Sequence, residues 1–318
     1  MGSSHSTNDT KSPTLSESHK SARNVLEKIA LQIYNQVKEK VYPHENELKG
    51  HLSNARFADA LVKSFHDMNY GPQDSCSLDH KFHTNINTGY TEGRKPCYER
   101  NEKRFSNEGE AKCGSDKIRD YGIKSAGGAC APFRRQNLCD KNLEYLINKN
   151  TENTHDLLGN VLVTAKYEGE SIVNNHPNKE TSDVCTALAR SFADIGDIVR
   201  GRDMFKPNDK DAVRHGLKVV FKKIYDKLSP EVQEHYKDVD GSENYYKLRE
   251  DWWTVNRNQV WEAITCRAPN EANYFRKGSD GTQLFSSQGQ CGHKEGTVPT
   301  NLDYVPQFLR WFEEWAED

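Results

Sequence analysis

The amino-acid sequence predicts an all-α protein made of a loop-rich, disulfide-stapled subdomain and a helix-bundle subdomain. Apolar residues recur at helical spacing over most of the chain outside residues 70–135. Five of the eight cysteines lie between residues 76 and 139, where that spacing is weak. No convincing run of strands appears. Together these observations predict helices that bury one another and a less regular part held by covalent bridges.

The composition excludes several classes of protein. The 318 residues carry a net charge of -3 with a pI near 6.5, which excludes a globally basic nucleic-acid binder. Mean hydropathy is -0.93, and no apolar run approaches the ~18–20 residues that a membrane span requires. The first twenty residues also lack the apolar core of a secretory signal peptide. Wholesale disorder is excluded because 12 Phe, 14 Tyr and 5 Trp are enough for a packed core.

The chain begins with a Ser/Thr/Asn-rich stretch that predicts a disordered tail. Its start, MGSSHS, fits the myristoylation pattern and equally a vector-derived leader. A helix with one apolar stripe is expected next, formed by Val25, Ile29, Ile33, Val37 and Val41. From about Asn54 a second helix is expected, with one face formed by Phe57, Leu61, Phe65 and Met68.

Eight cysteines without a CxxC pair predict up to four disulfides and an oxidising, extracellular setting. They are Cys76, Cys97, Cys113, Cys130, Cys139, Cys185, Cys266 and Cys291. Buried free thiols in a cytosolic protein are the alternative. The sequence leaves the pairing open.

Helical spacing returns after Asp140 and continues to the end of the chain. The expected helices lie at 140–150, 154–169, 182–201, 211–228, 242–266 and 305–318, and a Gly/Ser-rich loop is expected at 276–300. The last helix has an apolar side made of Val305, Phe308, Leu309, Phe312 and Trp315. It ends the chain without a capping glycine or polar tail, which suggests a fragment of a longer protein.

Four regions follow from these elements. They are a disordered tail at 1–20, an N-terminal helical segment at 21–55, a loop-rich disulfide-stapled subdomain at 56–165 and a helix-bundle subdomain at 166–318.

Signatures of catalysis and of metal binding are weak. The sequence has no GxSxG, HExxH, GxGxxG or Walker loop. Cys76, His80 and His83 could bind zinc, but a fourth ligand at finger spacing is absent. Cys291 with His293 is equally incomplete. A disulfide cysteine beside surface histidines is the simpler interpretation, so no catalytic residue, cofactor or metal is expected.

The helix expected at 211–228 carries the best candidate for a binding surface. Arg214, Lys218 and Lys222 follow one another at i, i+4 and i+8, with Lys223 beside them. The core-facing side would hold Val213, Leu217, Phe221 and Ile224. Like charges at this spacing repel one another, and the anions of a sulfated polysaccharide would relieve that repulsion. An ordinary solvated helix face is the alternative.

A second basic cluster lies in the loop-rich region, where eleven Lys/Arg oppose seven acids over residues 91–135. Contacts from loops are expected from Arg94, Lys95, Lys103 and Arg104. The N-terminal segment would extend the basic surface with Lys20, Arg23 and Lys28. Arg134 and Arg135 are expected to brace acidic groups instead, because Arg suits buried bidentate pairs.

The Trp/Tyr-rich helix at 242–266 allows two interpretations. Aromatic rings stack on the faces of sugars, as in lectins. A stripe of such rings at helical spacing is more often bundle core, and the core is expected here.

Several segments resemble the Duffy-binding-like domains of malaria parasites. They are GACAPFRRQNLCD (128–140), ARSFADIGDIVRG (189–201), WWTVNRNQVWEAITC (252–266) and PQFLRWFEEWAED (306–318), in family order. VLEKIALQIYNQV and ADALVKSFHD resemble the family's N-terminal segment. The whole looks like the N-terminal segment plus alpha-type domain of the var-encoded erythrocyte membrane protein adhesins of Plasmodium falciparum. MFKP (204–207), with Cys266 and Cys291 as the two cysteines between DIGDIVRG and WFEEW, resembles the subset linked to rosetting.

The resemblance implies a Duffy-binding-like fold without its cysteine-rich third subdomain. It implies a non-enzymatic adhesin on the surface of the infected erythrocyte, attached to the membrane through a downstream part of the parent protein. The partners would be host heparan sulfate-type glycans, blood-group sugars or erythrocyte surface receptors, and not nucleic acid. A protein receptor such as complement receptor, with the basic face incidental, is the alternative. A secreted hydrolase is a distant third.

Overall fold

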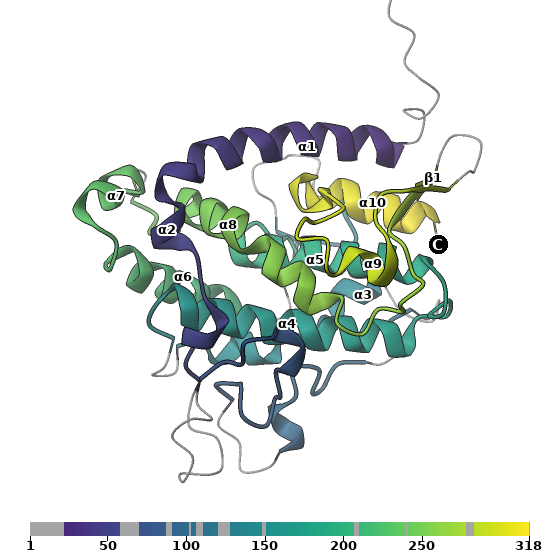
Figure 1. Ribbon diagram of the computed structural model, residues 1–318, viewed down its shortest axis with the longest axis horizontal. Coiled ribbons are helices and arrows are strands. Elements are labelled where there is room, and N and C mark those ends of the chain that lie inside the picture. The colour runs from purple at the N-terminus through teal and green to yellow at the C-terminus, as the bar shows by residue number, and fades with distance from the viewer. Residues whose placement is uncertain are drawn as a thin grey trace, which may run out of the picture.

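The protein is mostly helical, as the sequence predicts (Figure 1). The structure, a computed structural model, describes residues 22–57, 70–86, 91–101, 103–105, 111–119, 128–147, 151–206, 210–238, 241–277 and 283–317. The expected disordered tail and residues 58–69 of the expected second helix lie outside these ranges. Within them, no helix has both the length and the apolar character needed to cross a bilayer.

Among the residues that the structure describes, six helices are longer than two turns. They are α1 (Ala22–Val41), α4 (Thr154–Asn175), α5 (Asp183–Arg200), α6 (Ala212–Tyr225), α8 (Tyr246–Ile264) and α10 (Gln307–Glu317). The shorter ones are α2 (Glu45–Leu48), α3 (Phe133–Gln136), α7 (Pro230–His235) and α9 (Gly289–Gly292). Local chemistry sets several ends: the Asn153 side chain caps the first turn of α4, and Gly201, with φ of 76°, ends α5 in the left-handed region.

Helix α8 lies at the centre of the bundle, with α1 on one side and α4, α5 and α6 on the other (Figure 1). Its Trp252, Trp253 and Trp261 are buried, and Phe192 of α5 packs against Trp253 and Trp261. The aromatic residues of this helix therefore build the core, as expected. They do not form a sugar-stacking surface.

The N-terminal segment packs against α8. A polar contact also holds it on the chain near residues 274 and 300. Glu27 of α1 is buried and accepts hydrogen bonds from the Tyr274 hydroxyl at 2.7 Å, the Thr300 hydroxyl at 2.7 Å and the Asn301 backbone N–H at 2.8 Å. Only the last two members of the apolar stripe expected for this helix pack against the core, Val37 and Val41. Its members Val25, Ile29 and Ile33 are 42%, 49% and 39% exposed.

The expected loop at 276–300 contains a short antiparallel hairpin that the sequence does not predict. Strand β1 (Phe275–Lys277) pairs with β2 (Gln283–Phe285), with Phe275 opposite Phe285. The helix predicted at 140–150 is described up to residue 147. Within that part the chain forms a 3₁₀ helix over Lys141–Tyr145 in place of an α-helix. The expected subdomain boundary between residues 165 and 166 falls inside α4, which runs through it unbroken.

All eight cysteines form disulfides, in agreement with the prediction of four bridges. The pairs are Cys76–Cys266, Cys97–Cys139, Cys113–Cys130 and Cys185–Cys291. Two of these bridges join the ends of α5 and α8 to loops that are distant in sequence, with separations of 190 and 106 residues. Such bridges restrict the unfolded chain most strongly where the closed loop is long.

Buried ion pairs connect α3, α5 and α10. Arg134 donates to Asp194 at 2.6 Å and, through two nitrogens, to Glu314 at 2.8 Å. Arg310 donates to the other oxygen of Asp194, also at 2.6 Å. These contacts confirm the prediction that Arg134 braces acidic groups. The two arginines also hold the pKa of Asp194 well below its usual range although burial acts in the opposite direction.

Candidate glycan-binding surface

Helix α6 carries the basic face expected from the sequence. The Asp211 side chain caps the helix by accepting from the Arg214 backbone N–H at 3.1 Å, which starts the helix just before the first cation of the row. The predicted inner side is confirmed, because all four of its members are buried: Val213, Leu217, Phe221 and Ile224. Arg214, Lys218 and Lys222 therefore point away from the core, at steps of about 6 Å along the helix axis. We call these three residues, with Lys223 beside them, the α6 row.

The three lysines of the α6 row have acidic neighbours. Lys222 lies 2.6 Å from Asp226, and Lys223 lies 2.6 Å from Glu152. Lys218 donates to the Ser242 carbonyl at 2.9 Å, with the Glu243 carboxylate at 3.7 Å.

These contacts perturb two of the groups. The hydrogen bond with Asp226 raises the pKa of Lys222, and the hydrogen bond from Lys223 lowers the pKa of Glu152. The side chain of Lys222 is half exposed, and pairs exposed in this way are screened by solvent and contribute little to stability. An external anion can therefore replace these carboxylates at small cost.

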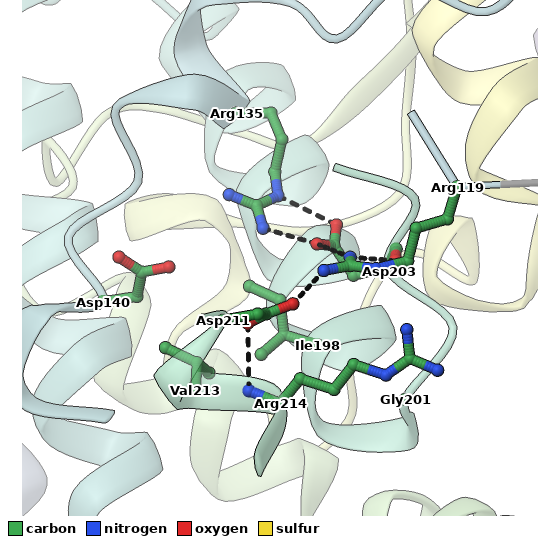
Figure 2. A pocket seen from close by; sticks show the side chains of 9 residues that line it. All are labelled: Arg119, Arg135, Asp140, Ile198, Gly201, Asp203, Asp211, Val213 and Arg214. Carbon is green, nitrogen blue, oxygen red and sulfur yellow. Dashed lines mark hydrogen bonds and ion pairs between the residues drawn. The ribbon is translucent and has the colours of Figure 1, made fainter. Parts of the chain in front are cut away.

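A pocket opens at the N-terminal end of α6 (Figure 2). It is lined by Arg119, Arg135, Asp140, Ile198, Gly201, Asp203, Asp211, Val213 and Arg214. Arg135 holds Asp203 through two nitrogens, at 3.0 and 2.7 Å, and Arg119 bonds Asp211. The sequence does not reveal this pocket, because Asp140, Asp203 and Asp211 come from three segments that meet only in the fold.

Arg94 is buried, so the expectation that it contacts a ligand from a loop is wrong. Its guanidinium donates to three backbone carbonyls, those of His80 at 3.2 Å, Thr84 at 3.0 Å and Ile86 at 2.6 Å. Burial lowers its pKa. The residue fixes the shape of the chain at 80–86 and is not available to a partner.

Arg104 is also buried, and the same expectation is wrong for it. Two of its nitrogens bond the buried carboxylate of Glu168 on α4, at 2.9 and 2.5 Å. Arg135, which the sequence assigns to a bracing role, does brace Asp203, and the charge of Asp203 keeps the pKa of Arg135 above its ordinary value despite burial.

The remaining predicted cations lie on separate segments. Lys95 is half exposed and pairs with Glu92 at 2.6 Å. Lys103 is exposed, and Lys28 is exposed on α1, which lies on the far side of α8 from α6 (Figure 1). Lys20 and the side chain of Arg23 lie outside the described residues. The structure thus keeps the α6 row together, and Lys28, Lys95 and Lys103 lie on other segments.

The possible zinc ligands do not converge. Cys76 is bound to Cys266, and His80 contacts the Tyr167 hydroxyl at 2.9 Å. The His83 Nδ1 accepts from the Asp79 backbone N–H at 2.9 Å. Across the described ranges, no three His, Cys, Asp or Glu side chains gather as a metal site would require.

Two models of known protein families match this chain. The family model of the Duffy binding domain matches residues 128–310, which is more than half of the chain. The chain belongs to the Duffy binding domain family. A second family model, for the N-terminal segments of PfEMP1, matches residues 21–56. The chain is therefore an N-terminal segment followed by a Duffy-binding domain of the alpha type, as the resemblance predicts.

Three similar proteins show how much of each relative this Duffy-binding chain covers. A Duffy receptor beta form from Plasmodium knowlesi is 26% identical over 209 residues, which cover 63% of this chain and 15% of that protein. The NTS-DBL1-alpha and CIDR-gamma double domain of PfEMP1 from the Plasmodium falciparum varO strain is 63% identical, with a TM-score of 0.86, covering 94% of this chain and 43% of that one. A PfEMP1 DBLβ domain bound to human ICAM-1 is 27% identical, with a TM-score of 0.69, covering 92% and 61%. The chain spans less than two thirds of each.

Proposed function

We propose that this Duffy-binding chain is a non-enzymatic adhesin module that binds host-cell glycans of the heparan sulfate type through the α6 row. It would act as part of an ectodomain on the surface of the infected erythrocyte, in rosetting or cytoadherence. Blood-group sugars and erythrocyte surface receptors are the further partners expected of such a module.

The observation that supports the glycan ligand most directly is the geometry of the α6 row. Three cations share one helix face at steps of about 6 Å, and the carboxylates paired with Lys218 and Lys222 are at least half exposed. Sulfated polysaccharides carry anions at comparable intervals. Exchange of a carboxylate for a sulfate keeps each lysine paired, while the polysaccharide gains several such contacts at once.

Chromatography on heparin with a rising salt gradient tests the proposal. Lys218→Glu with Lys222→Glu should abolish retention and leave the helical circular dichroism signal unchanged. The matched control reverses two exposed lysines away from the row, Lys40→Glu with Lys237→Glu, and so makes the same change in net charge. Retention of wild type should fall steeply with salt, because the screening length shrinks from ~10 Å at 0.1 M to ~3 Å at 1 M. Retention that survives reversal of the row would exclude this face as the site.

A protein receptor is the second candidate, favoured by the PfEMP1 DBLβ relative whose structure holds human ICAM-1. Binding of this kind depends on a shape-complementary patch, with the α6 row incidental. Erythrocyte binding that is insensitive to salt and unchanged by Lys218→Glu with Lys222→Glu would support it over the glycan.

A further inference from the structure

The pocket at the start of α6 is continuous with the α6 row, because Arg214 belongs to both (Figure 2). Its cavity volume is about 30 Å³. A single buried water needs roughly 10–15 Å³ by the same kind of measure. The pocket therefore has room for two water-sized oxygens side by side and is too small for a sugar ring.

Two polar atoms at the pocket lack partners among the described residues. Arg135 uses Nε and Nη2 on Asp203 and leaves Nη1 without a bond, although the side chain is only 4% exposed. Asp140 accepts from Arg100 at 2.7 Å through Oδ1 and leaves Oδ2 without a bond. A donor and an acceptor with no protein partner thus belong to two side chains that line one small cavity, and a ligand that enters it can bond both.

The net charge of the lining favours a hydroxylated group in the interior over a bare anion. Arg119, Arg135 and Arg214 are balanced by three aspartates. The guanidinium of Arg214 differs from the other two, since it makes no ion pair within the described ranges, and it extends past the pocket towards Gly201 (Figure 2). Positive charge without a carboxylate partner is therefore placed at the rim, and hydrogen-bonding groups are placed inside.

We propose that this pocket binds the vicinal diol of a uronic acid residue within the glycan. This proposal rests on the proposed glycan function, and it names the sugar unit that anchors the polymer at the start of the α6 row. The Arg135 Nη1–H donates to one hydroxyl oxygen, and the other hydroxyl donates to Asp140 Oδ2. The two hydroxyls replace two waters, and the carboxylate of the same residue pairs with Arg214. The sulfated units that follow then run along Lys218 and Lys222.

A chemical change in the ligand tests the proposed diol site without altering the protein. Periodate oxidation followed by borohydride reduction splits the C2–C3 bond of uronates whose two hydroxyls are free, and it leaves the sulfates in place. We would measure binding of a size-fractionated heparin oligosaccharide and of its glycol-split form by calorimetry at low salt. Wild type should bind the split form about tenfold more weakly, the loss expected for about two hydrogen bonds.

The variant Asp140→Asn gives the second arm, and Glu144→Gln is its matched control. Glu144 pairs with the same Arg100 at 3.1 Å but does not line the pocket. Asp140→Asn should bind both oligosaccharides with nearly equal affinity, whereas Glu144→Gln should keep the wild-type preference. Equal binding of the two oligosaccharides by wild type would overturn the diol site and leave the α6 row standing. Failure of both to bind wild type would overturn the proposed function itself.

Discussion

Replacing Glu27 by alanine tests how the N-terminal segment is held on the Duffy-binding domain. The carboxylate accepts three hydrogen bonds, and the hydroxyls of Tyr274 and Thr300 are fully buried. A hydrogen bond to a charged group contributes about 1.5–3 kcal/mol, so three independent bonds would contribute at least about 4.5 kcal/mol. The Tyr274 and Thr300 oxygens lie 3.0 Å apart and can bond each other once the carboxylate is gone. We therefore expect Glu27→Ala to lower the free energy of unfolding by about 3 kcal/mol.

Thermal unfolding and hydrogen exchange measure this effect. Unfolding entropy of about 2.1 cal/mol/K per residue converts 3 kcal/mol into a fall in Tm of about 4–5 °C for a chain of this length. Exchange of the α1 amides should accelerate more than that of α8. The control is Glu39→Ala, which removes the same side chain from an exposed position of the same helix. If the Tm of Glu27→Ala falls no further than that of Glu39→Ala, the buried carboxylate does not hold the segment.

Two further substitutions address the bundle. His155 accepts from the His51 backbone N–H through Nδ1 at 3.0 Å, and burial lowers the pKa of His155. The neutral imidazole therefore contributes its full stabilisation above about pH 6.5, and this stabilisation is lost as the pH falls through the pKa of the folded state. His155→Asn keeps an acceptor without that titration, and its Tm should fall less than that of wild type between about pH 7 and pH 5; parallel curves would contradict this. At Gly169, a Cβ would lie 1.9 Å from the Ile264 carbonyl oxygen, so Gly169→Ala should lower stability by about 2 kcal/mol or more in urea unfolding. Gly128→Ala meets no atom within 4 Å, and a similar loss there would refute the steric explanation.

The two terminal helices show what apolar spacing does not determine. In α1 Val25, Ile29 and Ile33 are exposed, because the helix packs through a neighbouring line of residues, Leu26, Ala30 and Tyr34. The buried carboxylate of Glu27, which accepts from three donors, lies beside that line. In α10 the predicted apolar side includes Phe312, which is 75% exposed, whereas Trp311 next to it is buried. Periodicity identifies a helix and its apolar residues. The packed face also depends on partners contributed by distant segments, which a local pattern does not contain.

The interior helices follow the sequence more closely. The inner residues of α6 and the three tryptophans of α8 are buried as predicted, since these helices are surrounded by others and their apolar sides have one place to pack. The α6 row could be predicted for the same reason, because its cations are fixed once the buried face is fixed. The pocket beside it could not. Asp140, Asp203 and Asp211 are ordinary loop aspartates in sequence and become a lining only through the packing of α3 and α5 against α6.

Arginine and lysine divide the positive charge of this chain between them, and this division decides where a polyanion can bind. Of the eleven basic residues at 91–135, five arginines are buried: Arg94, Arg104, Arg119, Arg134 and Arg135. Each is bonded to carboxylates or carbonyls, a role that suits the planar guanidinium. The apparent excess of positive charge in that region therefore lies largely inside the protein. Most of the described lysines, whose compact ammonium is strongly hydrated, stay at least partly exposed, although Lys166 is buried. A count of lysines consequently locates the exposed positive potential better than the net charge of a segment. Helix α1, with Lys28, Lys38 and Lys40, and helix α6, with Lys218, Lys222 and Lys223, carry three each. The regular row on α6 is the face that we propose for the sulfated glycan.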